Sequence, residues 1–131
     1  MGRRKAPTEV SRRTAREELP AAVLRVLVTT RDAVKPLSNV YLAQQQGQSA
    51  HPLQVADALG DWHRAQAEVR RAEHLLLGWL MQSGQFTVTS LARRSGYAPA
   101  TMNRRLSGTA ADHLGRDLTR RDDGQLWVSD R

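Results

Sequence analysis

The segment VTSLARRSGYAPATMNRRL, Val88 to Leu106, carries the clearest structural signal in the sequence. Its first half predicts a short helix that carries Leu91 and Ala92 on its inner face. Gly96 ends this helix, because glycine enters a positive-φ turn without a Cβ penalty. Two helices that cross closely need a small side chain at the contact point, and Ala92 supplies one. The first half therefore predicts a helix that ends in a tight turn.

The second half of the stretch predicts another short helix, which opens at Ala98-Pro99-Ala100. Proline suits the first helical position because the N–H that it lacks has no helical partner there. Met102 and Leu106 are four residues apart and share one face, which can pack on Leu91. Thr87 is a candidate N-cap for the first helix of the pair.

This spacing resembles the helix-turn-helix of bacterial repressors, with a LacI-like turn and a winged-helix-like continuation. The resemblance rests on Leu91-Ala92, Gly96-Tyr97 and Pro99-Ala100-Thr101-Met102 and covers about 20 residues firmly. It implies a DNA-binding transcriptional regulator whose second helix enters the major groove. Arg105 departs from the pattern, because such motifs often carry an aliphatic residue there; its stem can still pack while its head reaches water or phosphate.

The residues around the stretch complete the order of a winged helix over residues 64–131. Residues 85–88, QFTV, are expected to form a short extended piece. Residues 117–129 are expected to form a hairpin with a three-residue loop at 122–124, which pairs Leu118 with Val128 and Arg120 with Leu126. This register places Leu118, Leu126 and Val128 on one face that can pack on the helices, whereas a two-residue loop would split them. Trp127 is turned away from that face.

Two longer helices are expected before the stretch. Residues 17–35 repeat apolar positions at three and four, although the valine-rich run 21–28 is also compatible with a buried strand. Pro36 is expected to end or kink this helix. Leu37, Val40 and Tyr41 are compatible with a kinked helix that continues through Gln46, and residues 47–51 are expected to form a loop. Residues 52–83 form the longest periodic segment, and about 30 helical residues would span about 45 Å, more than a small globule covers. The helix therefore either breaks near Gly60 or pairs with a second copy of itself, and we favour pairing.

The first 16 residues contain Val10 as the only large apolar residue after Met1, which predicts a disordered basic arm. The arm is either a solubility tail or an addition to the phosphate and minor-groove contacts. Its deletion is expected to leave a folded protein. The expected organisation is thus an arm over residues 1–16, a helical dimerisation region over 17–63 and the winged domain over 64–131. The fold class is mainly α, with a β-hairpin wing.

The net charge of +7 is unevenly distributed. Residues 1–16 carry six basic side chains against one acid, and residues 88–106 carry four arginines without an acid. Residues 52–82 carry three basic residues against four acids. A polyanionic partner explains why the positive charge gathers on the tail and the motif.

The expected partner is double-stranded DNA, read by a homodimeric repressor at a palindromic operator. Residues 20–76 are expected to build the dimer contact through the Ala22–Val34 and Val55–Leu76 stripes, with Val69 in the middle. Asn103 and Arg104 are expected to read bases, because Asn pairs with adenine and Arg with guanine. The full expected DNA-binding set is Ala100, Thr101, Asn103, Arg104, Arg105, Ser107, Arg93, Arg94, Arg120, Arg121, Arg3, Arg4, Arg12 and Arg13.

Other function classes find no support in the pattern. The chain has no Cys and no pair of His three or four residues apart, so no metal, cofactor or catalytic site is expected, and the protein is expected not to be an enzyme. No run approaches a membrane span, and the expected location is the cytoplasm, on the nucleoid. The sequence does not identify a small-molecule effector. The alternative function is a helical interaction or adaptor protein, or an accessory factor of plasmid partition or replication.

Overall fold

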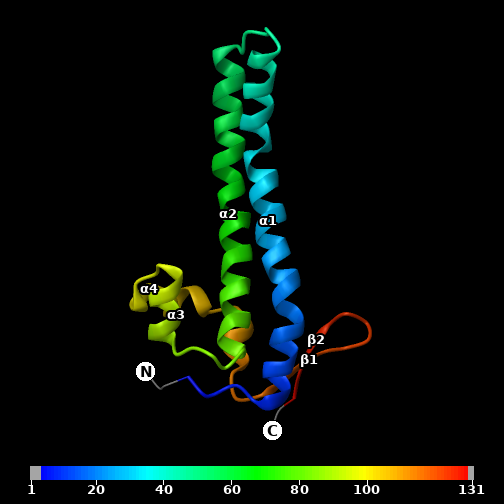
Figure 1. Ribbon diagram of the computed structural model, residues 1–131, viewed down its shortest axis with the longest axis vertical. Helices are drawn as coiled ribbons and strands as arrows, with labels where there is room; N and C mark the ends of the chain where they lie inside the picture. Colours follow the sequence, from blue (N-terminus) through cyan, green and yellow to red (C-terminus); the bar gives the residue numbers. More distant parts are fainter. Residues whose placement is uncertain (1–3, 130–131) are drawn as a thin grey trace. The chain divides into compact units, whose positions relative to one another are not determined.

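The computed structural model describes residues 4–129, which are mainly helical with one small antiparallel sheet (Figure 1). The elements in order are α1 (Glu9–Gln45), α2 (Pro52–Gln82), α3 (Val88–Ser95), α4 (Pro99–Leu106), the 3₁₀ helix η1 (Ala110–His113), β1 (Asp117–Arg120) and β2 (Leu126–Ser129). They fall into two compact units. The helical hairpin unit is Leu24–Glu73, and the terminal unit joins the chain up to Val23 with the chain from His74 onward.

The core of the terminal unit lies where α3 and α4 pack against the end of α2. The four positions predicted from the motif, Leu91, Ala92, Met102 and Leu106, are all buried, as the spacing predicts. The remaining buried members of this cluster are Leu77, Met81, Ala111 and Leu114. Phe86 and Tyr97 pack against it from the connecting segments.

The ends of α3 follow directly from local sequence chemistry. Thr87 caps the helix: its side chain accepts from the N–H of Ser90, and the Ser90 side chain accepts from the N–H of Thr87. This reciprocal pair satisfies two donors that the helix leaves open. At the other end Gly96 adopts φ 83°, and the N–H of Tyr97 bonds to the carbonyl of Ala92 at 2.9 Å. That 6→1 bond is the Schellman closure of a helix. The predicted cap and turn are confirmed.

Two residues of α2 hold η1 against it. A Cβ at Gly78 would lie 2.6 Å from the Cβ of Thr109 and 3.0 Å from the N of Ala110, so only glycine allows this approach. The side chain of Gln82 is fully buried, and its Nε2 donates to the carbonyl of Ala110 at 2.7 Å. Helical periodicity does not explain a glycine at position 78, and the close approach of η1 does.

The β-hairpin has the predicted register, with Leu118 opposite Val128 and Arg120 opposite Leu126. Leu118 is buried against Ala15 and Trp79, and Val128 packs beside them. Leu126, which the register predicts on the packed face, is 44% exposed, because the hairpin extends past the helices at its loop end. The expected extended piece at residues 85–88 is not a strand: the cap at Thr87 draws Val88 into α3.

The N-terminal segment differs most from its prediction. Residues 9–16, expected in a disordered arm, form the first turns of α1, and Ser11 and Ala15 are fully buried. The Ser11 hydroxyl donates to the carbonyl of Arg116 at 2.6 Å and accepts from the N–H of Leu118 at 2.8 Å. Small polar residues here do not bury much area; they satisfy main-chain groups beside β1. Because the segment has few apolar residues, its packing against β1 was not predicted from the sequence.

The helix α1 continues past Pro36 to Gln45, which agrees with the expected continuation through Gln46 and excludes an end at Pro36. Proline removes one main-chain hydrogen bond, but Val26, Ala33 and Val40 keep the helical spacing on both sides of it and are all at least half-buried. Continued packing in the hairpin unit outweighs the missing bond.

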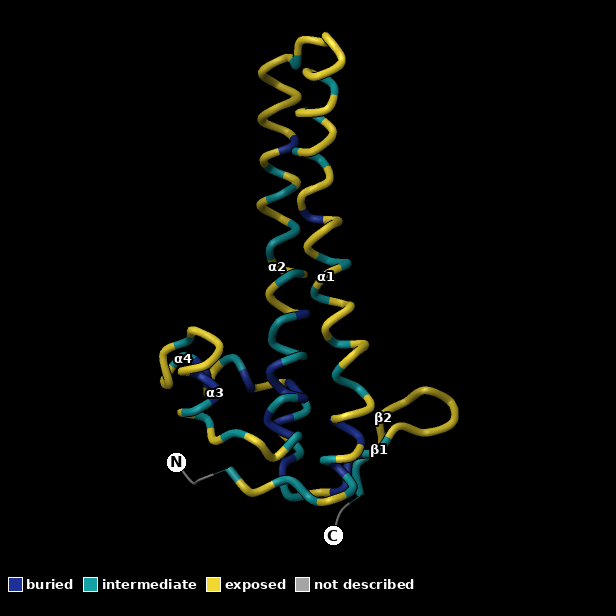
Figure 2. Tube along the Cα trace, viewed as in Figure 1, coloured by how far each residue is buried: buried dark blue, intermediate teal, exposed yellow. Residues whose placement is uncertain are grey.

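The two helices of the hairpin unit pack together through small side chains. Its buried residues are Ala33, Ala58 and Ala72, while most of its other residues are exposed (Figure 2). The helix α2 does not break at Gly60. Val69, expected at the middle of a dimer contact, is already half-buried within one copy of the chain. The large apolar side chains that stay exposed in this unit are Leu24, Leu27, Val34, Tyr41, Leu42, Leu53, Val55 and Leu59.

These two units group the chain differently from the boundaries drawn on the sequence. The second segment of the terminal unit begins at His74, whereas the sequence predicts a winged domain that begins at residue 64. The terminal unit also includes the start of α1. The expected dimerisation region at 17–63 overlaps the hairpin unit at 24–73. The physical reason is that Ser11, Ala15 and Glu18 bond to or pack on β1 and its neighbours.

Candidate nucleic-acid interface

The outer face of α4 presents the polar residues predicted to read DNA. Burial of Met102 and Leu106 turns Ala100, Asn103 and Arg104 outward, and all three are exposed. Ser107, at the C-cap of α4, is also exposed. Thr101 and Arg105 are half-buried at the edges of this face. The structure thus brings the six predicted residues of the second helix onto one short element.

Four arginines surround this face without a neutralising partner. Arg93 and Arg94 lie exposed in the last turn of α3, and Arg104 and Arg105 lie in the last turn of α4. Among residues 4–129, none of these four makes an ion pair, and residues 88–106 contain no acidic side chain. Exposed ion pairs occur elsewhere, including Arg64 with Asp61 at 2.6 Å. The positive field of the α3–α4 pair is therefore uncompensated locally.

Of the predicted arm residues that the structure describes, Arg4 lies at this face. Its Nε donates to Oδ1 of Asn103 at 3.5 Å, and its Nη2 donates to the main-chain carbonyl of Asn103 at 3.4 Å. Its Nη1 donates to the carbonyl of Ala111 at 3.3 Å. The sequence predicts Arg4 and Asn103 as independent contacts; the structure joins them.

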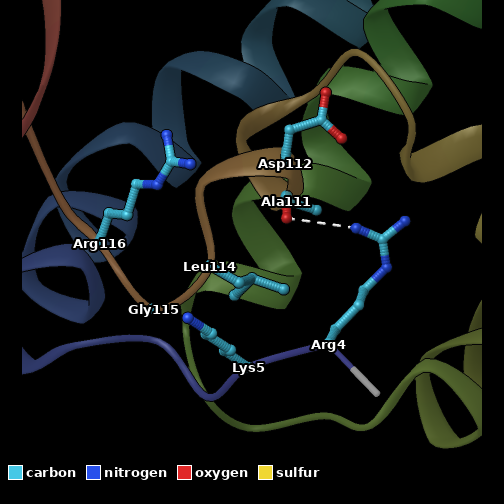
Figure 3. Close-up of a pocket in the computed structure, with 7 residues that line it drawn as sticks. All are labelled: Arg4, Lys5, Ala111, Asp112, Leu114, Gly115 and Arg116. Carbon is cyan, nitrogen blue, oxygen red and sulfur yellow. Dashed lines mark hydrogen bonds between the residues drawn. The ribbon is translucent and has the colours of Figure 1, made fainter. Parts of the chain in front are cut away.

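A pocket of about 460 Å³ opens beside this contact. Figure 3 shows Arg4 reaching Ala111 along one side, with Lys5 on Gly115 below and Asp112 above. A Cβ at Gly115 would lie 2.7 Å from the Lys5 side chain, so this glycine at φ 87° admits the lysine stem. The Asp112 carboxylate accepts from the N–H of Gly108 at 2.7 Å. The pocket is thus built largely from the N-terminal segment and the loop around η1.

The other predicted arm residues lie elsewhere. Arg12 packs across Gly84, where a Cβ would come within 2.6 Å of its Nε. Arg13 is exposed on α1. Arg3 lies outside the described residues. Of these arm residues, Arg4 therefore contacts α4, whereas Arg12 and Arg13 lie on α1.

The hairpin arginines are not joined to the α4 face. Figure 1 separates the β1–β2 hairpin from α3 and α4, with the start of α1 and the end of α2 between them. Arg120 binds both carboxylate oxygens of Glu18, with Nη2 to Oε2 at 2.8 Å, and also donates to the carbonyl of Gly124. The hydrogen bonds that Arg120 donates to the Glu18 carboxylate raise the pKa of Arg120. Arg121 lies over the ring of Trp127, with 5.8 Å to its centroid.

These contacts account for Arg120 without DNA and give Trp127 a partner that the sequence did not suggest. Sequence reasoning also missed Ser11, Glu18 and Gln82, whose roles depend on main-chain groups or side chains far away in the chain. Glu18 and Arg120 carry opposite charges, which is the one property that could suggest a contact between them. They are 102 residues apart, so the sequence does not indicate that they pair.

No protein-family model, curated protein or solved structure matches this chain. Among the described residues, no His, Asp and Glu side chains gather in a group that could hold a metal ion. None of the described helices combines the length and the apolar character needed to cross a bilayer.

Proposed function

We propose that the protein binds double-stranded DNA through α3 and α4, used as a helix-turn-helix with α4 in the major groove. The observation that carries this proposal is the pair of short helices itself. They present Asn103 and Arg104 outward and carry four arginines without an acid or an ion pair. Phosphate neutralisation supplies most of the affinity of DNA-binding proteins, and base-edge contacts supply specificity. The α3–α4 pair offers both arginines that can contact phosphates and side chains that can reach base edges.

The proposed roles divide by position. Asn103 and Arg104 read base edges, with Ala100, Thr101 and Ser107 at the edges of the contact. Arg93, Arg94 and Arg105 contact phosphates. We leave Arg120 out of this surface because Glu18 and Gly124 hold it.

The hairpin unit supports a second part of the proposal, which is self-association. Leu27, Val34 and Tyr41 are spaced by seven residues along α1 and all are exposed, with Leu27 at 61%. Such a repeat forms a continuous seam for a second helix. The unit carries six basic and five acidic residues, so two copies do not repel strongly. One recognition helix contacts too few base pairs to select a genomic site, whereas two copies can read a palindrome. A winged-helix regulator acting as a homodimeric repressor is the function that combines these features.

Selection of bound fragments from a randomised duplex library tests the proposal. We expect the wild-type protein to enrich a palindromic motif and Arg104→Ala to lose preference at one base pair per half-site, because one Arg–guanine pair supplies about 1–3 kcal/mol of discrimination. Arg70→Ala, which removes an exposed charge from the hairpin unit, is the matched control and is expected to keep the motif. If Arg104→Ala keeps the motif and loses only affinity, Arg104 is a phosphate contact instead.

The competing function is a helical adaptor, which the exposed apolar residues of the hairpin unit also suit. An adaptor would enrich no sequence from the library, whereas its hairpin unit would still associate. The same selection therefore separates the two functions.

A further inference from the structure

The main-chain carbonyl of Asn103 lies in the last turn of α4, where helical donors run out. The N–H of Ser107 bonds to the carbonyl of Arg104 at 3.3 Å rather than to that of Asn103. Arg4 supplies a donor to the Asn103 carbonyl through Nη2. A cation at the C-terminal end of a helix is also favoured by the helix dipole. Arg4 thus caps the proposed recognition helix from outside the helix itself.

The same guanidinium fixes the side chain of Asn103. Arginine has five N–H donors and no acceptor, so the amide atom that faces its Nε must be the oxygen, Oδ1. One guanidinium therefore holds the side-chain oxygen and the main-chain oxygen of the same residue. The Asn103 amide oxygen is turned back toward its own helix end, and its NH₂ group is the part left to face a ligand.

This orientation bears on base recognition. A bidentate pair with adenine needs Oδ1 to accept from N6 while the NH₂ group donates to N7. The amide oxygen keeps a second lone pair, but Arg4 turns it toward the end of α4, so the NH₂ group, a donor, is the part of Asn103 that meets a base edge. Guanine, adenine and thymine each present a major-groove acceptor to a donor, whereas cytosine presents its N4 amino group.

We infer that Arg4 is a specificity-determining positioning residue, which restricts Asn103 to donor-only reading of its base; this inference rests on the proposed DNA binding. The wild-type protein then accepts guanine, adenine or thymine at that base and rejects cytosine. Removing Arg4 frees the amide to form the adenine pair. Loss of a residue outside the recognition helix is therefore expected to sharpen, not relax, the preference.

Library selection with Arg4 variants tests this inference. We expect Arg4→Ala to favour adenine over guanine at the Asn103 base by about 5- to 100-fold, the range of one bidentate pair. Arg4→Lys keeps the charge but lacks the planar guanidinium whose separate nitrogens hold the two oxygens, so it is expected to shift the preference in the same direction. Arg16→Ala removes an exposed charge of the same N-terminal segment, outside the predicted DNA-binding set, and is expected to select the wild-type motif. The double variant Arg4→Ala/Asn103→Ala is expected to match Asn103→Ala alone, because Arg4 acts through Asn103.

A second measurement keeps the two proposals distinguishable and checks folding. In the free protein, the Asn103 side-chain NH₂ resonances are expected to be ordered in the wild type and mobile in Arg4→Ala, while the amide spectrum of the core is unchanged. Selection of the wild-type motif by Arg4→Ala would overturn the inference and leave the DNA proposal standing. A wild-type protein that selects no motif would overturn both, and the NMR result would then assign Arg4 to helix capping alone. A mobile Asn103 amide in the wild type would also overturn the inference.

Discussion

The helical hairpin unit and the terminal unit each contain part of α1 and α2, but they differ in which side chains they bury. In the hairpin unit the buried residues are alanines, and eight large apolar side chains stay exposed. In the terminal unit Leu77, Met81, Leu91, Met102 and Leu106 are buried. The hairpin unit is almost neutral, whereas the rest of the chain has fourteen basic residues against eight acidic ones.

In each unit, the extent of the apolar core and the balance of surface charge go together. The terminal unit completes its own core and leaves positive charge outward, as a nucleic-acid interface requires. The hairpin unit leaves apolar surface outward and balances its charges, as an association surface requires. Each of the following changes affects one unit and should leave the other intact.

The largest effect is expected from deletion of residues 2–16. This change removes Ser11 and Ala15, which satisfy the main chain beside β1 and fill the cluster around Trp79 and Leu118. We expect the terminal unit to lose cooperative folding, measured by thermal circular dichroism and by dispersion of its NMR spectrum. Arg13→Ala/Arg16→Ala, which removes charge but no buried group, is the control. A deleted protein with a native spectrum would restore the view of the segment as a dispensable arm.

Two glycines of α2 offer a matched pair, one in each unit. Gly78→Ala places a methyl group against Thr109 and Ala110, and overpacking of this kind costs about 1–3 kcal/mol. Gly60→Ala meets only the exposed end of the Arg64 side chain at 3.3 Å, so the gain in helix propensity, up to about 1 kcal/mol, should prevail. Denaturant unfolding measures both. Equal effects at the two positions would mean that η1 does not approach α2 closely.

The smallest effect on stability is expected from Leu27→Glu in the exposed seam of the hairpin unit. Because Leu27 is 61% exposed, the fold of one copy should change by less than about 0.5 kcal/mol. Self-association should weaken strongly, since the change places like charges at the contact. Analytical ultracentrifugation measures the oligomeric state, and Arg25→Ala, which lowers the net charge by the same single unit, is the control for charge alone. A variant that stays associated would place the contact elsewhere.

Several parts of the fold could be predicted from sequence because their causes are local. The Thr87 cap, the turn at Gly96, the buried face of Met102 and Leu106 and the register of the β-hairpin each depend on residues close together in the chain. Neighbouring residues determine each of these features, so spacing alone is sufficient to predict them.

The remaining parts depend on partners far apart in sequence. Ser11 bonds to residues more than 100 positions away, and Arg4 reaches Asn103 across a similar interval. Polar and charged residues of this kind show no periodicity before the fold brings their partners together. The candidate site was therefore predictable as a set of residues on α4, but its link to the N-terminal segment was not.

The most direct test of DNA binding by the terminal unit is the salt dependence of affinity for a duplex carrying the selected motif. Two double variants remove equal charge: Arg93→Ala/Arg94→Ala from α3, and Arg25→Ala/Arg70→Ala from the hairpin unit. We predict that the α3 variant lowers the slope of log affinity against log salt by about 0.9 for each phosphate that the protein no longer neutralises, while the hairpin variant keeps the wild-type slope. Equal slopes for both variants, or a wild-type affinity that does not respond to salt, would contradict this assignment.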